Sequence, residues 1–367
     1  MKKKNVFMYA ACSALMAFGF VGCDDDDPVL NPTPEEAKTS TGVYIMNSGK
    51  WKGNNATLDY YGFESKELKT KVFSTINGRG LGDTANDMLV YGSKMYIAVS
   101  TSNTIEIMDL NANSLKTISP KDEAGQPQSP RYFAAYEGKV YATLFDGHLA
   151  EIDTTTMEIT KQVAVGPNPY QVCSLKGKLY VANSGGYNPV QDSTLSVVDP
   201  VSFKEEKKIV VGLNPTSVYA DKSGELYVGC MGNFYNVKAS VQRVNLEKGT
   251  SEAILTNDNI LISSTADDQL LIINSENDAN WQPVNTKFSQ YDMATDKMVS
   301  DNFITDGTKV EKPYSLSSDP TLGYIYVGTS DYVNTGDVFI FTKEGKLVTK
   351  LAASGINPMA VRGVTLQ

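Results

Sequence analysis

The chain has 367 residues, of which 41% are hydrophobic and 20% charged, a composition typical of a globular protein. Its 33 basic and 42 acidic residues give a net charge of −9, which argues against binding to nucleic acid or to an anionic lipid surface, since both need a basic protein surface. The single histidine, His148, excludes metal sites built on several histidines and two-histidine relays.

The first 22 residues are predicted to be a lipoprotein signal peptide that is not part of the fold. Three lysines, Lys2 to Lys4, precede an apolar run from Val6 to Phe20 that is too short to span a bilayer comfortably. The run ends in Phe20-Val21-Gly22-Cys23, which resembles a bacterial lipobox with Phe in place of the usual Leu. Cys23 is therefore expected to carry lipid. The alternative is an ordinary cleaved signal followed by a solvated acidic tail.

The residues after the lipobox predict where the protein is held. Asp24 to Asp27 follow directly, and an acidic run at this place resembles the export signal of lipoproteins on the outer face of the outer membrane. Residues 23–41, rich in Asp, Pro and Glu, are predicted to be a flexible tether. We therefore expect a lipid-anchored outer-membrane protein that faces the cell exterior and contacts the membrane through its lipid only.

Residues 42–367 are predicted to form an all-β domain made of seven repeats. Short alternating runs rich in Tyr, Val and Ile are bounded by Gly, Asn, Asp and Pro, and no helical periodicity of useful length occurs. The repeat length of about 47 residues suits four short strands, as in a propeller blade. The recurring units are Tyr44–Asn47, Tyr96–Val99, Tyr141–Thr143, Tyr180–Asn183, Tyr227–Cys230, the degenerate Leu271–Asn274, and Tyr326–Thr329.

The two ends of this domain are expected to share a blade. The first repeat opens directly at Val43-Tyr44 and lacks the innermost of its four strands, while a spare strand-like segment lies at Asn357–Val364. Pairing the two removes the unpaired edges that an open propeller would leave. A sandwich or two smaller β domains would not explain this match. The sequence thus predicts a seven-bladed β-propeller closed by its C-terminal strand, which completes the first blade.

The connections between strands predict a working face. If the strands of a blade are lettered A to D from the inside, the B–C and D–A loops share one face and the A–B and C–D turns share the other. Five B–C loops, the longest spanning residues 275–285, carry aromatic residues suited to a bulky ligand with an apolar body and a polar rim. The alternative is that Trp51 and Trp281 only brace their own loops. The predicted ligand-binding residues are Asn47, Trp51, Arg131, Asn183, Tyr187, Asn233, Tyr235, Asn274, Trp281, Asp331 and Tyr332.

The sequence favours a binding protein over an enzyme. It contains no Ser-His-Asp spacing, glycine-rich phosphate loop or CxxC motif, and Asp278 and Asn280 are too sparse for a calcium loop. His148, beside Asp146, is expected to be a strand-edge histidine. Arg131 opens an inner strand, where a structural ion pair is the alternative to a role in the channel. No catalytic residue, cofactor or metal site is predicted.

Several stretches of the chain resemble a known family. The Tyr-Val-Ala-Asn unit, the Asn-Pro pairs that open inner strands and the Asp-x-x-Thr turns resemble the YncE-type propellers. Asn54–Tyr61, Leu81–Met88 and Ser129–Tyr132, together with the lipobox, resemble the surface-exposed propeller lipoproteins that include the BtuG vitamin B12 capture proteins. The resemblance covers residues 42–367 and implies a propeller that binds cobalamin and passes it to a TonB-dependent outer-membrane transporter. It supplies no ligand-contact motif, so the predicted site rests on loop geometry.

The expected function is therefore capture of a scarce, bulky nutrient at the cell surface and its delivery to a transporter. Cobalamin is the leading ligand, because a corrin ring is wide, amphipathic and fringed with amides, which suits aromatic walls with Asn, Ser and backbone groups as partners. Two alternatives stay open: a protein-interaction scaffold of a surface complex, and a lactonase-like propeller hydrolase.

Overall fold

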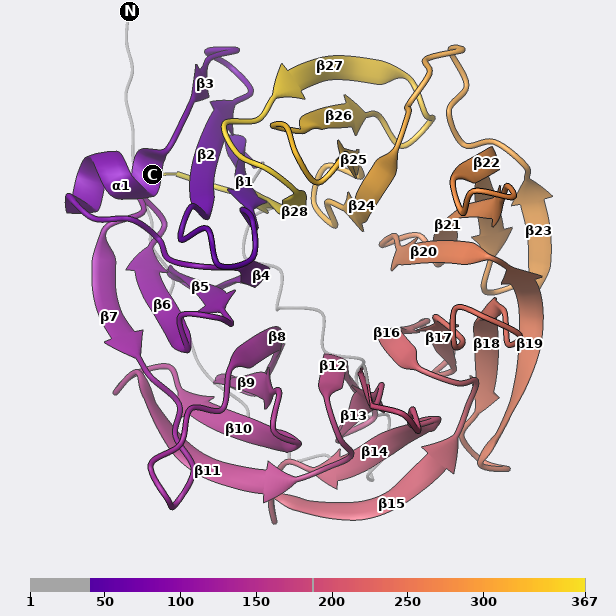
Figure 1. The fold of residues 1–367 in the computed structure, drawn as a ribbon, viewed down its shortest axis with the longest axis horizontal. Coiled ribbons are helices and arrows are strands. Elements are labelled where there is room, and N and C mark those ends of the chain that lie inside the picture. The colour runs from indigo at the N-terminus through magenta and orange to yellow at the C-terminus, as the bar shows by residue number, and fades with distance from the viewer. Residues whose placement is uncertain (1–39, 187, 367) are drawn as a thin grey trace, which may run out of the picture. The chain divides into compact units, whose positions relative to one another are not determined.

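A computed structural model describes residues 40–186 and 188–366 of the chain. Within these residues, seven four-stranded antiparallel sheets are arranged as the blades of a propeller (Figure 1). The predicted all-β, seven-bladed fold is confirmed.

The strands follow one another outward in each blade, from the innermost strand A to the outermost strand D. The first blade contains β28 (Pro358–Val364), β1 (Gly42–Asn47), β2 (Thr57–Gly62) and β3 (Leu68–Lys69). The second contains β4 (Ala85–Tyr91), β5 (Lys94–Val99), β6 (Thr104–Asp109) and β7 (Ser114–Ile118), and the third β8 (Pro130–Tyr136), β9 (Lys139–Leu144), β10 (His148–Asp153) and β11 (Glu158–Ala164). The fourth contains β12 (Pro169–Leu175), β13 (Lys178–Asn183), β14 (Thr194–Asp199) and β15 (Lys204–Val210), and the fifth β16 (Pro215–Ala220), β17 (Leu226–Cys230), β18 (Ala239–Asn245) and β19 (Thr250–Asn257). The sixth contains β20 (Asn259–Ser264), β21 (Gln269–Asn277), β22 (Pro283–Asp292) and β23 (Lys297–Ser300), and the seventh β24 (Pro313–Ser318), β25 (Ile325–Thr329), β26 (Asp337–Phe341) and β27 (Leu347–Ala352).

The C-terminal strand closes the propeller as the sequence predicts. β28 pairs antiparallel with β1, and Val364 lies opposite Gly42 at the start of that strand. On the side of the seventh blade, the hydroxyl of Ser315 donates to the carbonyl of Pro358 at 2.6 Å. On the side of the second blade, Arg362 forms an ion pair with Asp87. One segment at the end of the chain therefore contacts three blades.

The repeated tyrosine of strand B lies in the core between neighbouring blades. All six of these tyrosines are 6% exposed or less, and the apolar Leu271 takes the same place in the sixth blade. The hydroxyl of Tyr44 donates to the carbonyl of Leu110 in the next blade at 2.9 Å, and that of Tyr227 to the carbonyl of Met293 at 3.1 Å. A ring with a polar tip can fill the space between two sheets and still bond across it, as these two tyrosines do. The hydroxyl of Tyr96 is buried without a hydrogen-bond partner in the described residues, so packing is what the repeated rings have in common.

One short helix, α1 (Val72–Asn77), interrupts the strands between the first two blades. It was not predicted, because six residues are too few for a helical periodicity to show. Its Phe73 is buried in the core, and Asp59 accepts a hydrogen bond from the backbone N–H of Lys71 at 2.8 Å. In the part of the chain that the structure describes, no helix is long and apolar enough to cross a membrane.

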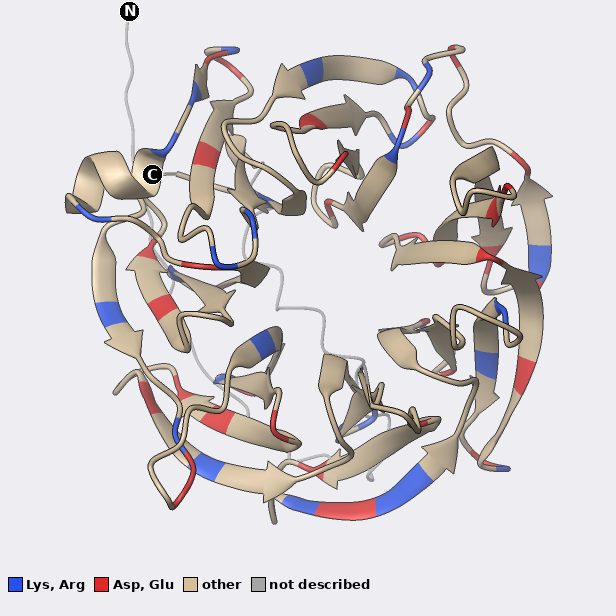
Figure 2. Ribbon diagram, in the orientation of Figure 1, with Lys and Arg blue, Asp and Glu red and all other residues tan. Residues whose placement is uncertain are grey.

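The outermost strands carry charges of both signs. Lysines and glutamates follow one another along β15, and Figure 2 shows blue or red segments on outer strands such as β7, β11 and β23. An outermost strand has unpaired N–H and C=O groups along one edge, and charged side chains there discourage pairing with another chain. The outer edges of the blades are therefore protected.

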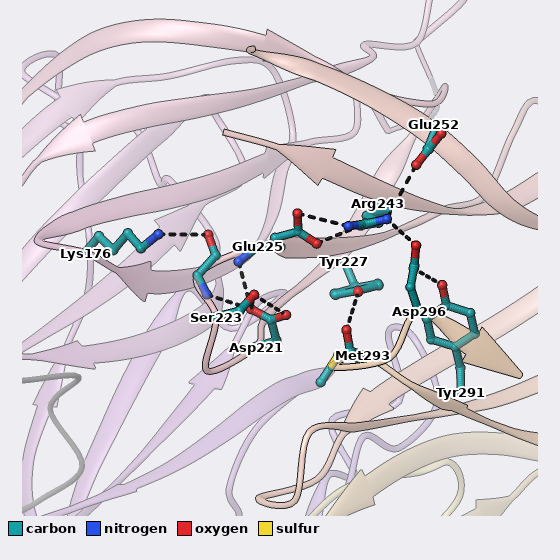
Figure 3. A network of polar contacts seen from close by, with 11 residues as sticks. Lys176, Asp221, Ser223, Glu225, Tyr227, Arg243, Glu252, Tyr291, Met293 and Asp296 are labelled. Carbon is teal, nitrogen blue, oxygen red and sulfur yellow. Dashed lines mark hydrogen bonds and ion pairs between the residues drawn. The ribbon is translucent and has the colours of Figure 1, made fainter. Parts of the chain in front are cut away.

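We call the side of the A–B and C–D turns the turn face, and the side of the B–C and D–A loops the loop face. On the turn face, an ionic network joins the fifth and sixth blades (Figure 3). Nε of Arg243 lies 2.6 Å from Oε2 of Glu225, and its Nη1 pairs with Asp296 of the sixth blade. Glu225 is the main cause that raises the pKa of Arg243 above its ordinary value. This network therefore links the fifth and sixth blades on the turn face.

Candidate functional site

Exposed aromatic side chains are confined to the loop face. Among the described residues, six aromatic side chains are exposed, and all six belong to B–C loops. They come from five blades, and apolar surface gathered on one face in this way is typical of a binding surface. The six residues are Trp51, Phe145, Phe234, Tyr235, Trp281 and Tyr332.

Four of the five rings predicted from the sequence are among them. The exposed fractions are 67% for Trp51, 85% for Tyr235, 62% for Trp281 and 66% for Tyr332. The fifth, Tyr187, lies outside the described residues. Rings that are mostly in solvent contribute little to the core, so a ligand in solution can reach these four side chains.

The bases of three long B–C loops are fixed by a repeated asparagine. Asn168, Asn214 and Asn357 each stand directly before the proline that opens an inner strand, and each has a left-handed backbone, with φ of 46°, 59° and 58°. Asparagine tolerates this conformation because its short side chain bonds locally. Each side-chain amide donates to the carbonyl of a loop glycine. The bonds run from Asn168 to Gly185 at 2.8 Å, from Asn214 to Gly232 at 3.3 Å and from Asn357 to Gly49 at 3.2 Å.

A buried carboxylate fixes the loop of Trp51. Asp83 comes from the D–A loop before the second blade and is 8% exposed. Its two oxygens accept hydrogen bonds from the backbone N–H groups of Lys52, at 3.1 Å, and Asn54, at 3.2 Å. The ammonium of Lys52 lies 4.4 Å from the centroid of the Trp51 ring. The carboxylate therefore braces this loop, and the indole stays exposed.

Trp281 stands at the tip of a β-hairpin, where the sequence predicts a long loop over residues 275–285. β21 continues to Asn277 and β22 begins at Pro283, so only residues 278–282 form the turn between the two strands. Oδ1 of Asp278 accepts hydrogen bonds from the N–H groups of Asn280 and Gln282, both at 2.8 Å. The expectation of a loop was wrong, because cross-strand pairing continues through polar residues that sequence periodicity does not mark as strand.

Two predicted polar residues shape their own loops. Oδ1 of Asn233 accepts hydrogen bonds from the three backbone N–H groups that begin with Tyr235, at 2.9 to 3.0 Å. Asp331 accepts hydrogen bonds within the loop of Tyr332, and those from Asn334 are the main cause that lowers its pKa to about 2. These side chains hold the turns from which the rings project, and their acceptors are already engaged.

Three predicted asparagines are inside the blades, which corrects their assignment to a ligand-binding surface. Asn47 and Asn183 are 0% exposed and Asn274 is 4% exposed. The amide of Asn183 donates to the hydroxyls of Thr194 and Ser196 at 3.0 and 2.8 Å. All three stand at or near the ends of B strands and bond to the neighbouring C strand. They support the loops from within.

A cluster of aromatic rings surrounds Arg131 where the inner strands begin on the loop face. The guanidinium carbon of Arg131 lies 4.0 Å from the ring centroid of Tyr170 and 5.3 Å from that of Phe145. Tyr170 also stacks on Tyr132, with 5.3 Å between the ring centroids. Arg131 is 9% exposed. We call Arg131, Tyr132, Tyr170 and Tyr314 the floor of the site.

The floor tyrosines were missed from the sequence, although a signal marks them. Tyr170 and Tyr314 directly follow the prolines that open β12 and β24, and Tyr132 follows one residue later in β8. Tyr314 meets Tyr332, one of the six exposed rings, edge-on, with 5.5 Å between the ring centroids. An aromatic residue just after an inner-strand proline is therefore placed at the centre of the loop face.

A polar cavity of about 420 Å³ lies among the inner strands, and Tyr132 is part of its lining. It also contains Asp87 and Arg362, with Nη2 of the arginine 3.2 Å from Oδ1 of the carboxylate. Burial raises the pKa of Asp87 above its ordinary value. The ion pair with Arg362 and a hydrogen bond from the N–H of Phe133, at 3.0 Å, lower it only in part.

Replacing Asp87 with Asn is expected to change how stability depends on pH. A carboxyl whose pKa is raised on folding holds its proton more tightly in the folded state. As the pH rises above about 4 toward the pKa of the folded state, the wild type should lose stability relative to Asp87→Asn, with a slope of at most about 1.4 kcal/mol for each pH unit. Denaturant unfolding of both proteins at pH 4, 5, 6 and 7 checks this. A wild type that gains stability relative to the variant over this range would contradict the assignment.

The histidine and the acidic residues of the described part form no metal centre. Nδ1 of His148 lies 2.9 Å from Oδ2 of Asp146, which also accepts a hydrogen bond from Gln128 at 2.9 Å. His148 is the first residue of β10, as expected for a strand-edge histidine. Among residues 40–186 and 188–366, no group of three or more His, Cys, Asp and Glu side chains is placed to hold a metal ion.

Comparisons with known proteins identify a family and a fold. Residues 41–354 match the family described as "Domain of unknown function (DUF5074)". No curated protein sequence matches the chain. Among solved structures, hydrazine synthase of Kuenenia stuttgartiensis is similar, with a TM-score of 0.59 and 16% sequence identity. The match covers 74% of this chain and 86% of that chain, and at this identity it shows a likeness of fold alone.

Proposed function

We propose that this chain, which belongs to the DUF5074 family, binds a bulky small molecule with an apolar body on its loop face. The observation that carries the proposal is the confinement of all six exposed aromatic rings of the described residues to the B–C loops. We call these six rings the rim. Two of them contact the floor: Tyr332 meets Tyr314, and the guanidinium carbon of Arg131 lies 5.3 Å from the ring centroid of Phe145.

The rigidity of the loops supports a binding role. Asn168, Asn214 and Asn357 fix loop bases, while Asp83 and Asp278 fix the segments that present the two tryptophans. A site that is already ordered loses less conformational entropy when its ligand binds. Aromatic rings add large contact area with few rotatable bonds. Both features favour capture of a ligand without rearrangement of the blades.

Cobalamin is the ligand that we propose first, and transfer to a TonB-dependent transporter is the proposed next step. The support for both is the resemblance of Asn54–Tyr61, Leu81–Met88 and Ser129–Tyr132 to the vitamin B12 capture lipoproteins. The width of a corrin ring also suits a rim that draws on five blades. A protein partner is the second candidate, because exposed apolar rings also serve protein interfaces.

Titration of the purified protein with cyanocobalamin, haem and a panel of glycans tests this proposal. Saturable 1:1 binding of cyanocobalamin is expected, by calorimetry or by quenching of tryptophan fluorescence. Binding of haem or a glycan alone would overturn the choice of cobalamin and keep the capture role. If none of the ligands binds, the capture role loses its support and the scaffold alternative gains it.

The proposed location makes a separate prediction, which concerns Cys23, a residue outside the described part of the chain. Replacing Cys23 with Ser should release the protein from membranes, because stable attachment needs the several acyl chains that this cysteine would carry. Fractionation of cells that express the wild type or Cys23→Ser checks this. A variant that still sediments with the outer membrane would contradict a lipid anchor at this residue.

A further inference from the structure

Three of the four arginines of the chain serve as structural ion-pair partners. Arg79 lies 2.9 Å from Glu106, Arg362 lies 3.2 Å from Asp87, and Arg243 contacts the carboxylates of Glu225, Asp296 and Glu252 (Figure 3). Their side chains are 43%, 33% and 28% exposed. In this protein, a partly exposed arginine is thus neutralised by an acidic residue.

Arg131 breaks this rule although it is the most buried of the four. It is 9% exposed, and no carboxylate pairs with it among the described residues. One of its donors has a partner. In the amide orientation of Asn86 that satisfies both of its ends, the side-chain oxygen accepts a hydrogen bond from Nε of Arg131 at 3.3 Å. The donors on its two terminal nitrogens have no hydrogen-bond acceptor in the part of the chain that the structure describes.

The acidic residues beside Arg131 are already engaged. Asp146 is the next residue in the chain after Phe145, whose ring lies beside Arg131, and it is hydrogen-bonded to Gln128 and His148. Asp87, which follows Asn86, is paired with Arg362 and bonded to a backbone N–H. Acidic residues outnumber basic ones in the chain, which has a net charge of −9. The absence of a carboxylate beside Arg131 is therefore not explained by a shortage of acidic residues. The site keeps one guanidinium without such a partner.

A guanidinium on a side chain that is 9% exposed keeps little of its water, and its charge is poorly compensated when no carboxylate lies beside it. The rings of Tyr170 and Phe145 hold its plane in position, and the fork of donors on its terminal nitrogens matches the two oxygens of a carboxylate or a phosphate. We infer that the ligand of the loop face carries an anionic group, a carboxylate or a phosphate, and that Arg131 binds it. This inference rests on the proposed function and names the class of its ligand: a small molecule with an apolar body and an acidic group.

A set of matched fluorescent probes tests the inference. 1-Pyrenebutyrate, 1-pyrenebutanol and 1-pyrenebutylamine share one flat apolar body and differ in the charge of a short tail, and pyrenebutyl phosphate separates phosphate from carboxylate preference. Titration of the wild type should give a Kd for the better of the two anionic probes at least 10-fold below that of the alcohol, and the amine should bind most weakly.

Two arginine variants place this selectivity at Arg131. Arg131→Met should bind the anionic probes no better than the alcohol, while Arg131→Lys keeps a part of the preference because it keeps the charge. Arg243→Met, on the turn face, is the matched control and should keep the full preference. Arg131→Met should melt at or above the temperature of the wild type, whereas Arg243→Met should melt lower, because it leaves three carboxylates without their partner.

The outcomes separate this inference from the proposed function. Equal binding of all probes by the wild type overturns the anionic ligand and leaves the capture role in place. An anion preference that survives in Arg131→Met overturns the assignment to Arg131. Failure of every probe to bind overturns the inference, and the titration with cyanocobalamin, haem and glycans then decides separately whether the capture role stands. A lower melting temperature for Arg131→Met with unchanged probe selectivity shows a structural arginine.

Discussion

Deletion of residues 357–367 should abolish the cooperative unfolding transition of the propeller. It removes β28, whose Val361 and Val364 are 1% and 2% exposed. Burial of such a side chain contributes roughly 1.5 to 3 kcal/mol, and the two together approach the low end of the roughly 5 to 15 kcal/mol that a domain typically has. The deletion also exposes the edge of β1 and takes Arg362 away from Asp87. Thermal melting and the soluble yield measure the effect.

The matched control is deletion of residues 365–367, which leaves β28 complete. That protein should melt within a few degrees of the wild type, because it keeps every strand pair of β28, although it loses the partial packing of Leu366 and that residue's hydrogen bond to Thr41. If the longer deletion also melts cooperatively near the wild-type temperature, closure by β28 is not what holds the first blade to its neighbours.

Alanine at a true anchor of the loop face should weaken ligand binding by about 2 kcal/mol or more, which is roughly a 30-fold rise in Kd. The variants are Trp51→Ala, Tyr235→Ala, Trp281→Ala and Tyr332→Ala, and Tyr187→Ala completes the predicted set. Their stability should change little, because the four described rings are 62% exposed or more. Titration with the ligand that the wild type binds best, alongside melting curves, separates the two effects.

Val201→Ala is the matched control for these variants. Val201 is 81% exposed and lies in the turn between β14 and β15, on the turn face. Its loss should leave both affinity and melting unchanged. If the aromatic variants lose stability and keep full affinity, the rings brace their loops and the ligand, if there is one, binds elsewhere.

The fold was predictable because each blade repeats local signals. Alternation of apolar residues, a tyrosine in strand B and turn residues at the strand ends recur at a nearly constant spacing, and each is visible within a few residues. Closure could be predicted as well, because a missing strand at one end and a spare strand at the other can be counted without knowledge of their contacts.

The roles of individual site residues were harder to predict, and the asparagines show why. Asn47, Asn183 and Asn274 are the last residues of their repeated strand units in the sequence, next to the predicted loops, so they were predicted to face a ligand. In the fold they are buried against the next strand of the blade. Side chains alternate between the two faces of a strand, so a shift of one position moves a side chain from one face to the other. Sequence pattern does not locate strand ends to within one residue.

The sequence by itself determined the number of blades, their closure by the C-terminal strand and the face on which aromatic loops gather, because these follow from periodicity and from the alternation of strand connections. The tertiary structure alone decided what fills the centre of that face. Tyr132, Tyr170 and Tyr314 come from three blades. Arg131 lies beside the rings of Tyr132, Tyr170 and Phe145, without a carboxylate partner in the described residues. Contacts between residues far apart in the chain depend on how the blades close around a centre, which no local pattern records.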